Sequence, residues 1–150
     1  PIQPTLVPKK NGSIVAYMRD SGLEPKRILK SISKDNGVTW SFAKDTQIPN
    51  PSSSVEVLVL KNGHWVMACN DTEEGRHQMV ILLSNDEGSS WLWKRYIGQA
   101  PKNSNISFAY PSLIQSSDGL IHISYSFKTD EGKTIQHASF SEDWITVKTR

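Results

Sequence analysis

The sequence predicts an all-β fold of repeated four-stranded antiparallel units, the pattern of a β-propeller. The segment Ser33–Trp40 returns as Ser84–Trp91, 51 positions later, with Ser, Asp, Gly and Trp at matching places. Short apolar runs separated by turn signals surround both copies, and helical periodicity is almost absent. Because four-stranded units that repeat at this spacing are typical of propeller blades, we expect about three blades in the 150 residues.

The first unit, residues 1–49, contains a strong hairpin signal at Asn11-Gly12, which stands between two apolar runs. Asn and Gly both accept the positive φ of a tight turn, so this pair joins neighbouring strands. A second turn, which contains Asp35 and Gly37, leads into the last strand of the unit. The strands expected here are Gln3–Val7, Ser13–Arg19, Arg27–Ile32 and Trp40–Phe42.

The second unit, residues 50–100, and the third, residues 106–150, repeat this order of strands and turns. Asn62-Gly63 and Asp118-Gly119 stand at their first hairpin turns. Ser141–Trp144 is a shortened copy of the Ser33–Trp40 segment, so the third unit is also expected to be four-stranded. The strands expected in these two units are Ser54–Leu60, His64–Asn70, Gln78–Leu83 and Trp91–Tyr96, then Tyr110–Ile114, Leu120–Tyr125 and Thr134–Phe140.

A closed propeller needs more blades than these repeats provide. Propellers have roughly four to eight blades, and three alone leave two open sheet faces and an unfilled axis. We therefore expect the chain to form about half of a propeller, with the upstream blades outside it. Exposed blade edges of such a portion favour self-association.

Composition excludes several classes of partner. The net charge is only +2 and the 17 Lys and Arg are scattered, so a nucleic-acid surface is not expected. No apolar run approaches the roughly 20 residues of a membrane helix. Cys69 is the only cysteine and lies in an apolar run, which predicts a buried, inert thiol and no disulfide. His64, His77, His122 and His137 lack metal-ligand spacing, so neither a metal nor another cofactor is expected.

Aligning the units on their first hairpin turns identifies positions that share one mouth of the propeller. The first strand of each blade lies nearest the axis, so positions equally far from these turns converge there. Eight residues before the turns stand Gln3, Ser54 and Tyr110, and eight residues after them stand Arg19, Asn70 and Ser126. Arg76 begins the run into the third strand of the second unit. The alignment thus predicts a polar funnel with two arginines and a tyrosine.

Two arginines at such a funnel favour an anionic ligand. A guanidinium group binds a carboxylate through two parallel N–H···O bonds, and a tyrosine beside it can act as a nucleophile. The alternative is that Arg19 and Arg76 are solvated charges at loop ends, paired with carboxylates such as Asp20, Glu73 or Glu74. Tyr110, which precedes a proline, is on that alternative a packing residue.

The chain also resembles a known family. Ser33–Trp40 and Ser84–Trp91 are similar to the Asp-box of BNR repeats, and the whole chain resembles part of a six-bladed sialidase-like propeller, about half of it. The resemblance implies that Arg19 and Arg76 belong to the group of arginines that holds the substrate carboxylate. It also implies that Tyr110, within Phe108–Leu113, is the nucleophile. The Asp-box residues themselves have structural roles in a turn that we expect away from the funnel.

One position departs from the family pattern. Sialidases pair the tyrosine with a glutamate, and this chain has Gln3 in that place, where an amide cannot take the phenolic proton. Glu56, two residues after Ser54 and on the same strand face, is the nearest substitute. The alternative for Glu56 is an inward carboxylate solvated in the axial channel. The family's acid/base aspartate and its first triad arginine have no counterpart in these residues.

These residues and the resemblance predict a sialidase-type glycoside hydrolase whose partner is an acidic glycan. The catalytic residues would be Tyr110 and Glu56, and the substrate-binding residues Arg19, Arg76, Gln3, Ser54 and Asn70. Three alternatives remain: a propeller that binds acidic glycans without cleaving them, a hydrolase for a uronate-type sugar, and a structural propeller whose partner surface lies elsewhere. The residues leave the compartment open, and the resemblance favours a secreted or cell-surface protein.

Overall fold

The computed structural model describes residues 1–147 as three antiparallel sheets and one short helix. The first sheet has the order β1-β2-β3-β4, so each strand pairs with its neighbour in the chain. Its strands are β1 (Ile2–Pro8), β2 (Ile14–Arg19), β3 (Arg27–Ser33) and β4 (Lys44–Pro49). This is the meander that the hairpin signals predict.

The second and third sheets repeat the meander. The second has the order β5-β6-β7-β8, and the third has the order β9-β10-β11. Their strands are β5 (Glu56–Val59), β6 (Trp65–Cys69), β7 (Gln78–Ser84), β8 (Trp93–Gln99), β9 (Ser107–Gln115), β10 (Ile121–Thr129) and β11 (Gly132–Phe140). The helix α1 (Glu142–Thr146) follows β11. It is too short and too polar to cross a membrane, and it is the only helix among the described residues.

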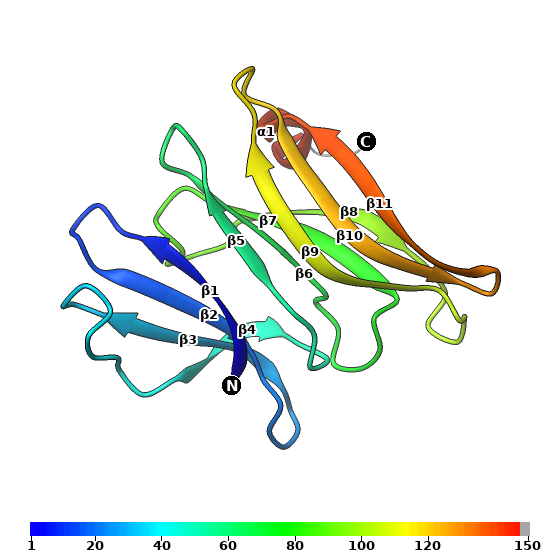
Figure 1. Cartoon of the computed structure of the whole chain (residues 1–150), viewed down its shortest axis with the longest axis horizontal. Helices are drawn as coiled ribbons and strands as arrows, with labels where there is room; N and C mark the ends of the chain where they lie inside the picture. Colours follow the sequence, from blue (N-terminus) through cyan, green and yellow to red (C-terminus); the bar gives the residue numbers. More distant parts are fainter. Residues whose placement is uncertain (148–150) are drawn as a thin grey trace.

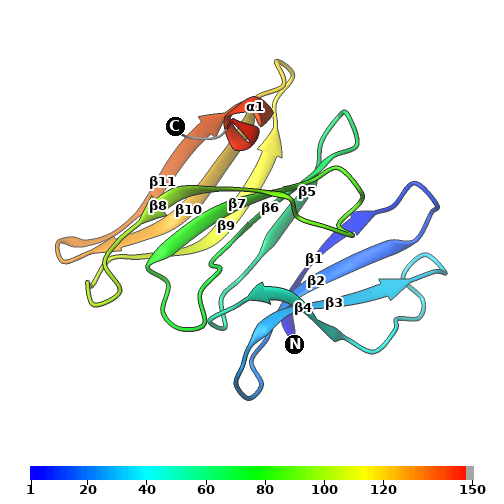
Figure 2. The ribbon, with the colours of Figure 1, turned by 180° about the vertical axis from the view of Figure 1, so that it is seen from behind.

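The first strands of the three sheets lie side by side, β1 against β5 and β5 against β9 (Figures 1 and 2). The hydroxyl of Thr5 on β1 accepts a hydrogen bond from the backbone N–H of Val57 on β5 at 3.3 Å and lies 3.5 Å from its carbonyl oxygen. The sheets therefore stand in chain order around one line of inner strands. This arrangement confirms the predicted all-β architecture of propeller blades.

The core lies between successive sheets, and β6 supplies both of its layers. Alternate side chains of a strand point to opposite faces, and every residue of β6 is buried because each face meets another sheet. Trp65, Met67 and Cys69 pack toward the first sheet, whereas Val66 and Ala68 pack toward the third. Cys69 is fully buried, as predicted, and burial raises the pKa of its thiol.

The fourth strands begin later than the sequence predicts. We expected the fourth strand of the first unit at Trp40–Phe42, but β4 starts at Lys44. The backbone N–H of Ser41 donates to the carbonyl of Ile32 at 3.0 Å, and the indole N–H of Trp40 donates to the carbonyl of Gly37 at 3.0 Å. These bonds hold residues 40–42 within the turn. In the second unit β8 likewise starts at Trp93 rather than at Trp91.

The third sheet has three strands, because a helix follows β11 where a fourth strand was expected. Ser141 caps this helix, since its hydroxyl accepts a hydrogen bond from the backbone N–H of Trp144 at 3.3 Å. Glu142 and Asp143 in the first turn suit the positive end of the helix dipole. The guanidinium of Arg95 on β8 stacks on the Trp144 ring at 4.6 Å, which attaches the helix to the second sheet.

The repeated turns have a structural role. In the first, a carboxylate oxygen of Asp35 accepts from the hydroxyl of Ser33 and from the backbone N–H of Thr39, both at 2.8 Å, and Gly37 has a φ of +85°. The turn that contains Asp86 forms the same bonds. Ile14 pairs with Ser33 while Arg19 pairs with Ile2, so the Asp35 turn and Arg19 lie at opposite ends of the first sheet.

Candidate functional site

Gln3 and Tyr110 occupy equivalent irregularities in two inner strands. Each precedes a proline, each has a φ of +53°, and each lies where the pairing register shifts by a bulge, in β1 and in β9 respectively. Positive φ in a residue other than Gly costs on the order of 1–3 kcal/mol and concentrates at functional sites. A bulge redirects a side chain away from the regular pleat. The fold therefore aims both side chains out of their sheets at the same end of the inner strands.

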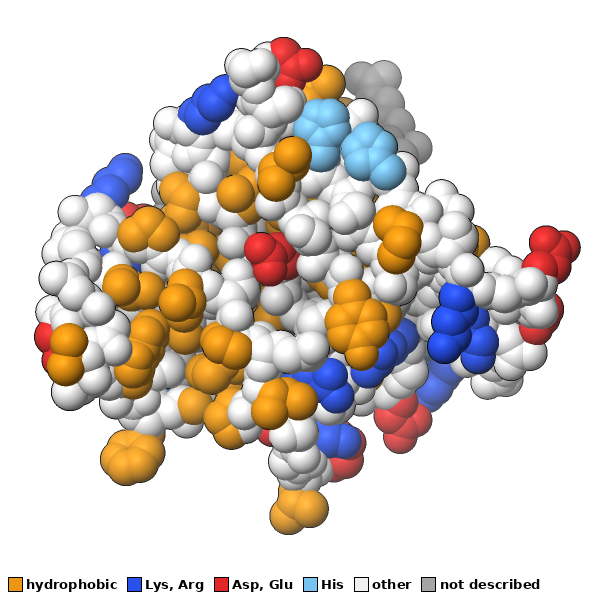
Figure 3. Space-filling view, viewed as in Figure 1, with side chains coloured by type: hydrophobic (Ala, Val, Ile, Leu, Met, Phe, Trp, Pro, Cys, Tyr) orange, Lys and Arg blue, Asp and Glu red, His pale blue; other side chains and the backbone are white. Residues whose placement is uncertain are grey.

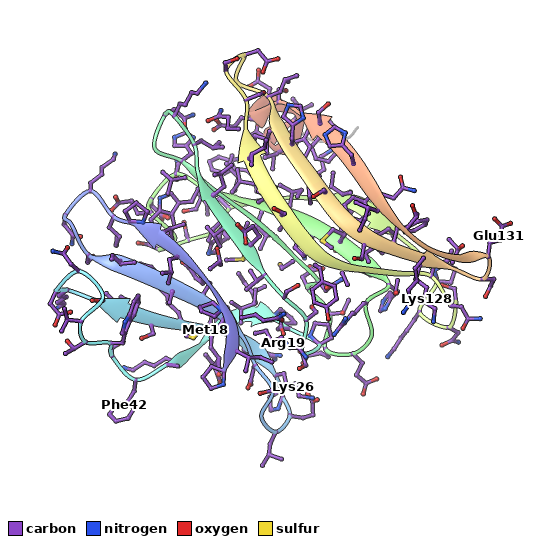
Figure 4. The ribbon with its side chains drawn as sticks, in the orientation of Figure 1. Met18, Arg19, Lys26, Phe42, Lys128 and Glu131 are labelled. Carbon is purple, nitrogen blue, oxygen red and sulfur yellow. The ribbon has the colours of Figure 1, made fainter. Side chains whose placement is uncertain are left out.

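Arg19 lies at the end of β2 (Figure 4). One terminal N–H of its guanidinium donates to the amide oxygen of Gln3 at 3.0 Å, and its Nε–H donates to the hydroxyl of Ser52 at 3.3 Å. Neither acceptor is charged. Neutral oxygens thus hold the guanidinium group of Arg19 in place, and its positive charge is not neutralised.

Arg76 is also hydrogen-bonded to Ser52. Its terminal N–H donates to the carbonyl of Ser52 at 3.1 Å, and the centre of its guanidinium lies 5.7 Å from the ring centroid of Tyr110. Tyr110 remains half exposed. Gln3, Arg19, Ser52, Arg76 and Tyr110 therefore form one continuous chain of contacts across the three sheets.

The carboxylates proposed as surface partners for the arginines are engaged elsewhere or lie apart. Glu73 pairs with Arg27 at 2.6 Å, and Glu74 lies 3.5 Å from Lys102. Within residues 1–147, neither Arg19 nor Arg76 has a carboxylate oxygen within 4 Å of its side chain. The alternative that these arginines form surface ion pairs therefore lacks its partners.

Ser52 is the member of this group that sequence reasoning missed. The alignment selected Ser54, which is two residues further on and has a buried hydroxyl without a partner among the described residues. Ser52 has a φ of +57° in a turn closed by Asn50, whose side chain accepts from the N–H of Ser53 at 3.0 Å and donates to its carbonyl at 2.9 Å. The Asn50-Pro51 pair is a turn signal that could have revealed this loop.

Glu56 is the first residue of β5 and is half-buried. Burial raises the pKa of its carboxyl above the ordinary value of 4.5, and the neighbouring Thr5 hydroxyl partly opposes that shift. A carboxylate that holds a proton more strongly than usual is a suitable proton acceptor. Among the described residues no hydrogen bond joins Glu56 to Tyr110, so the structure places it on the adjacent inner strand without direct contact.

Asn70 lies behind this group and is fully buried. Its side-chain amide N–H groups donate to the backbone carbonyl of Phe108 at 3.0 Å and to that of Gln78. The first of these bonds ties the end of β6 to β9, two residues before Tyr110. This position supports a role in fixing the strand that carries Tyr110.

A pocket of about 320 Å³ opens beside Tyr110 and is rich in cationic side chains. Ser126, which the alignment selected, lies in its wall together with Arg76. Lys128 and Lys133 also line it, and sequence reasoning missed both. Lys and Arg side chains gather along the lower right of the face in Figure 3, and Lys128 is labelled near that edge in Figure 4. The pocket and the arginines thus form one surface suited to an anion.

The described residues contain no cluster of three or more His, Cys, Asp or Glu side chains that could hold a metal ion. His122 and His137 do lie together, with their ring nitrogens 3.0 Å apart, but the other side chains around them are Ser and Ile. The pairing registers place this pair at the end of the third sheet opposite Lys128. The surface around Tyr110 is therefore the candidate site.

Comparison with solved structures shows the same fold in carbohydrate-active proteins. The Hadza microbial sialidase Hz136 matches 95% of this chain with a TM-score of 0.74 at 17% identity, and the match covers 28% of that chain. An alpha-L-arabinofuranosidase from Fusarium graminearum matches 93% with a TM-score of 0.72 at 17% identity, over 45% of its length. A PL25 ulvan lyase matches 95% with a TM-score of 0.61 at 15% identity, over 39% of its length.

The protein thus spans less than half the length of each of these three structures. A search of curated proteins gave no match. The family model for the BNR repeat-like domain, in contrast, matches residues 1–123. Together with the three meander sheets and their repeated turns, this match shows that the chain belongs to the BNR repeat-like domain family.

Proposed function

We propose that this protein is a sialidase-type glycoside hydrolase that releases a terminal acidic sugar, sialic acid or a related one. The observation that carries the proposal is the shared anchoring of Arg19 and Arg76 on Ser52, beside the half-exposed Tyr110. The two guanidinium groups are fixed in place, and the described residues offer no carboxylate to neutralise them. An incoming carboxylate would provide that charge.

The arginines would hold the sugar carboxylate through charge-assisted hydrogen bonds. Such bonds are roughly twice as strong as those between neutral groups, and a guanidinium group can form two in parallel with one carboxylate. Ser52 accepts one N–H from each arginine and Gln3 accepts one more from Arg19, so the remaining N–H donors are free to bind the ligand. Gln3 would restrain Arg19 and contact the substrate at the same mouth, and Ser54 and Asn70 would support it.

Tyr110 would attack the anomeric carbon. The phenolic oxygen would form a bond to that carbon while the bond from the carbon to the glycosidic oxygen breaks, and the leaving oxygen would keep the electron pair and take a proton from water. A second water would then bond to the anomeric carbon, break its bond to the tyrosine and return a proton to the phenolic oxygen. A neutral phenol repels an anionic sugar less than a carboxylate does, which is why sialidases depart from the two-carboxylate scheme. We assign the phenolic proton to Glu56, a carboxylate on the adjacent inner strand whose pKa is raised by burial. Because no hydrogen bond joins the two side chains, the proton would pass through an intervening water.

The comparisons support this proposal at the level of fold and sugar chemistry. One of the three similar structures is a sialidase, one is an arabinofuranosidase and one is a polysaccharide lyase, so carbohydrate is the substrate class that their names share. The order of Arg19, Arg76 and Tyr110 along the repeats favours the sialidase type among them. The resemblance of the Asp35 and Asp86 turns to Asp-boxes agrees with this choice.

The direct test is hydrolysis of a fluorogenic sialoside and a fluorogenic glucuronide by the complete protein. Replacing Tyr110 by Phe removes the nucleophilic oxygen and retains the ring against Arg76, so turnover should fall at least about a hundredfold. Tyr96→Phe, which removes a hydroxyl from β8 in the second sheet, is the matched control and should retain full turnover. Undiminished turnover by the Tyr110→Phe variant would remove the nucleophile assignment.

Gln3 favours a second candidate function, the capture of acidic glycans without cleavage. It stands in the bulge equivalent to that of Tyr110, and its amide oxygen already accepts a hydrogen bond from Arg19, so it cannot serve as a base. Tight binding of a sialylated or glucuronate-containing oligosaccharide with no released sugar would favour this function over hydrolysis. Release from the glucuronide alone would instead indicate a hydrolase for uronate-type sugars, a choice suggested by the ulvan lyase, whose structure holds a fragment containing glucuronate.

A further inference from the structure

We propose that Lys128 and Lys133 form a second anion subsite beside Tyr110, which binds a sulfate group on the sugar adjacent to the one held by the arginines. The inference rests on the proposed function in one respect, because it takes the arginines as the subsite for the first acidic sugar. It adds a substrate class: glycans that carry anions on two neighbouring sugars.

The strand register brings the two lysines together. Lys128 on β10 and Lys133 on β11 are direct partners across the hairpin, two positions from the pair formed by Ser126 and Ile135. Directly opposed residues of an antiparallel pair point to the same face, so the two ammonium groups share one side of the sheet. Like charges in this arrangement repel each other, and an anion between them relieves that repulsion.

Carboxylates near this hairpin do not neutralise the lysines. Asp130 accepts a hydrogen bond from the side chain of Asn105 at 2.6 Å, and Glu131 lies at the tip of the hairpin, beyond Lys128 in Figure 4. Over residues 1–147, neither Lys128 nor Lys133 has a carboxylate oxygen within 4 Å. Both side chains are exposed and therefore available to a ligand.

A second cross-strand lysine pair differs from this one in its hydrogen bonding. Lys30 and Lys44 are partners in the first sheet, but Lys30 is half-buried and donates to the carbonyl of Gly88 at 3.2 Å. That pair has a protein acceptor for one of its charges. Among residues 1–147, the ammonium groups of Lys128 and Lys133 donate no hydrogen bond to a side chain or to the backbone, so both charges of this pair are available to a ligand.

The pocket joins this pair to the proposed catalytic surface. Arg76, Tyr110, Lys128 and Lys133 all line the same pocket of about 320 Å³. A glycan whose terminal acidic sugar reaches the arginines therefore places its next sugar over the lysines. Ammonium groups are compact point charges without the planar fork that matches a carboxylate, so they suit the tetrahedral oxygens of a sulfate.

The test measures binding of matched oligosaccharides by calorimetry, using the complete protein with Tyr110→Phe to prevent turnover. The probes are 3′-sialyllactose and a glucuronate-containing disaccharide, each with and without one sulfate on the sugar next to the acidic one. A third glucuronate disaccharide carries a carboxylate in place of that sulfate. We expect the sulfate to increase affinity about tenfold at low salt, and the carboxylate to increase it less.

The double variant Lys128→Gln/Lys133→Gln should lose this gain, so that the sulfated and unsulfated members of a pair bind alike. Lys34→Gln/Lys44→Gln removes the same charge from exposed lysines, one in the turn after β3 and one in β4, and should keep the gain. If the gain is absent in the parent protein or survives in the Lys128→Gln/Lys133→Gln variant, the second subsite is wrong while the first stands. If none of the probes binds, the proposed function itself fails and this inference fails with it.

Discussion

Arg19 and Arg76 come from different sheets but are bound to the same residue, Ser52. The Nε–H of Arg19 donates to its hydroxyl at 3.3 Å, and a terminal N–H of Arg76 donates to its carbonyl at 3.1 Å. A single residue thus sets the separation of the two guanidinium groups. Because Ser52 lies in the loop between β4 and β5, the connection between two blades positions both arginines.

Arg76→Lys should weaken binding of the sugar carboxylate with little effect on folding. Lysine keeps the charge but loses the planar fork that both Ser52 and a carboxylate use. Loss of one charged hydrogen bond corresponds to about 1.5–3 kcal/mol, so KM for the hydrolysed sugar should rise on the order of ten- to a hundredfold. Steady-state kinetics with the substrate identified above measures this change.

Arg27→Lys is the matched control for that variant. Arg27 pairs with Glu73 at 2.6 Å in an exposed position, where an ion pair contributes little. The KM of the Arg27→Lys variant should equal that of the unsubstituted protein. An Arg76→Lys variant that retained the original KM would show that Arg76 does not contact the carboxylate.

Glu56→Gln should lower activity and raise stability at neutral pH. Burial raises the folded-state pKa of this carboxyl above 4.5, so the folded protein favours the protonated form and loses stability as pH rises from the unfolded-state pKa through the folded one. A neutral amide avoids that loss. The same amide cannot accept the phenolic proton, so kcat should fall about a hundredfold.

The pH dependence separates these two effects. Activity that requires an ionised Glu56 rises with pH through its raised pKa, and this acidic limb should disappear from the kcat profile of Glu56→Gln. Urea unfolding at pH 7 should give the variant a free energy of unfolding equal to or above that of the parent. A variant that is less stable at pH 7 and unchanged in its kcat profile would contradict both assignments.

Asp86→Asn should destabilise the fold at neutral pH but not in strong acid. Hydrogen bonds from Ser90 hold the pKa of Asp86 at about 2, below the ordinary 3.8. The bond from the Ser90 hydroxyl has the larger effect, and the bond from the Ser90 backbone N–H the next. A carboxyl with a lowered folded-state pKa contributes stability above its unfolded-state pKa, and this contribution is lost as pH falls through the folded-state value. The side chain is exposed, so solvent screening reduces the effect to about 1 kcal/mol.

Urea unfolding of the parent and the Asp86→Asn variant at several pH values tests this prediction. The difference in free energy of unfolding should be constant from pH 7 to about pH 5, shrink as the pH approaches and passes the ordinary pKa of 3.8, be mostly lost at about pH 2 and vanish below it. Asn85→Ala, at the exposed neighbouring position in the same turn, should show no such pH dependence. A difference that persists unchanged at pH 2 would exclude the carboxylate as its source.

The sequence predicted elements well where the signal is local. Asn11-Gly12, Asn62-Gly63 and Asp118-Gly119 each mark a hairpin turn, and the structure has one at each place. The predicted starts of β4 and β8 were wrong because tryptophan, such as Trp40, is a residue type that is common in strands. The position of Trp40 is set by a hydrogen bond back to Gly37 within the turn. In the third unit the choice of helix over strand depended on the cap at Ser141, which the repeat pattern concealed.

For the site, counting residues from the hairpin turns predicted which positions of the inner strands face the same opening of the propeller. Counting from the hairpin turns could not identify Ser52. This residue lies in the loop from β4 to β5, whose length and turn, closed by Asn50, do not follow from the repeat. Counting could not find Lys128 and Lys133 either, since their pairing depends on the long hairpin that extends past the expected strand ends.

The sequence by itself determined the all-β class, the repeated antiparallel meander and the family, because apolar alternation and turn residues act over a few neighbours and recur at a fixed interval. Only the tertiary structure added Ser52, Lys128 and Lys133 to the groups around Tyr110 and the arginines. Residues from the loop before β5, the loop before β7 and the β10–β11 hairpin meet there only when the sheets pack on β6. Contacts of that kind depend on the distances between sheets, and no short-range pattern in the chain encodes those distances.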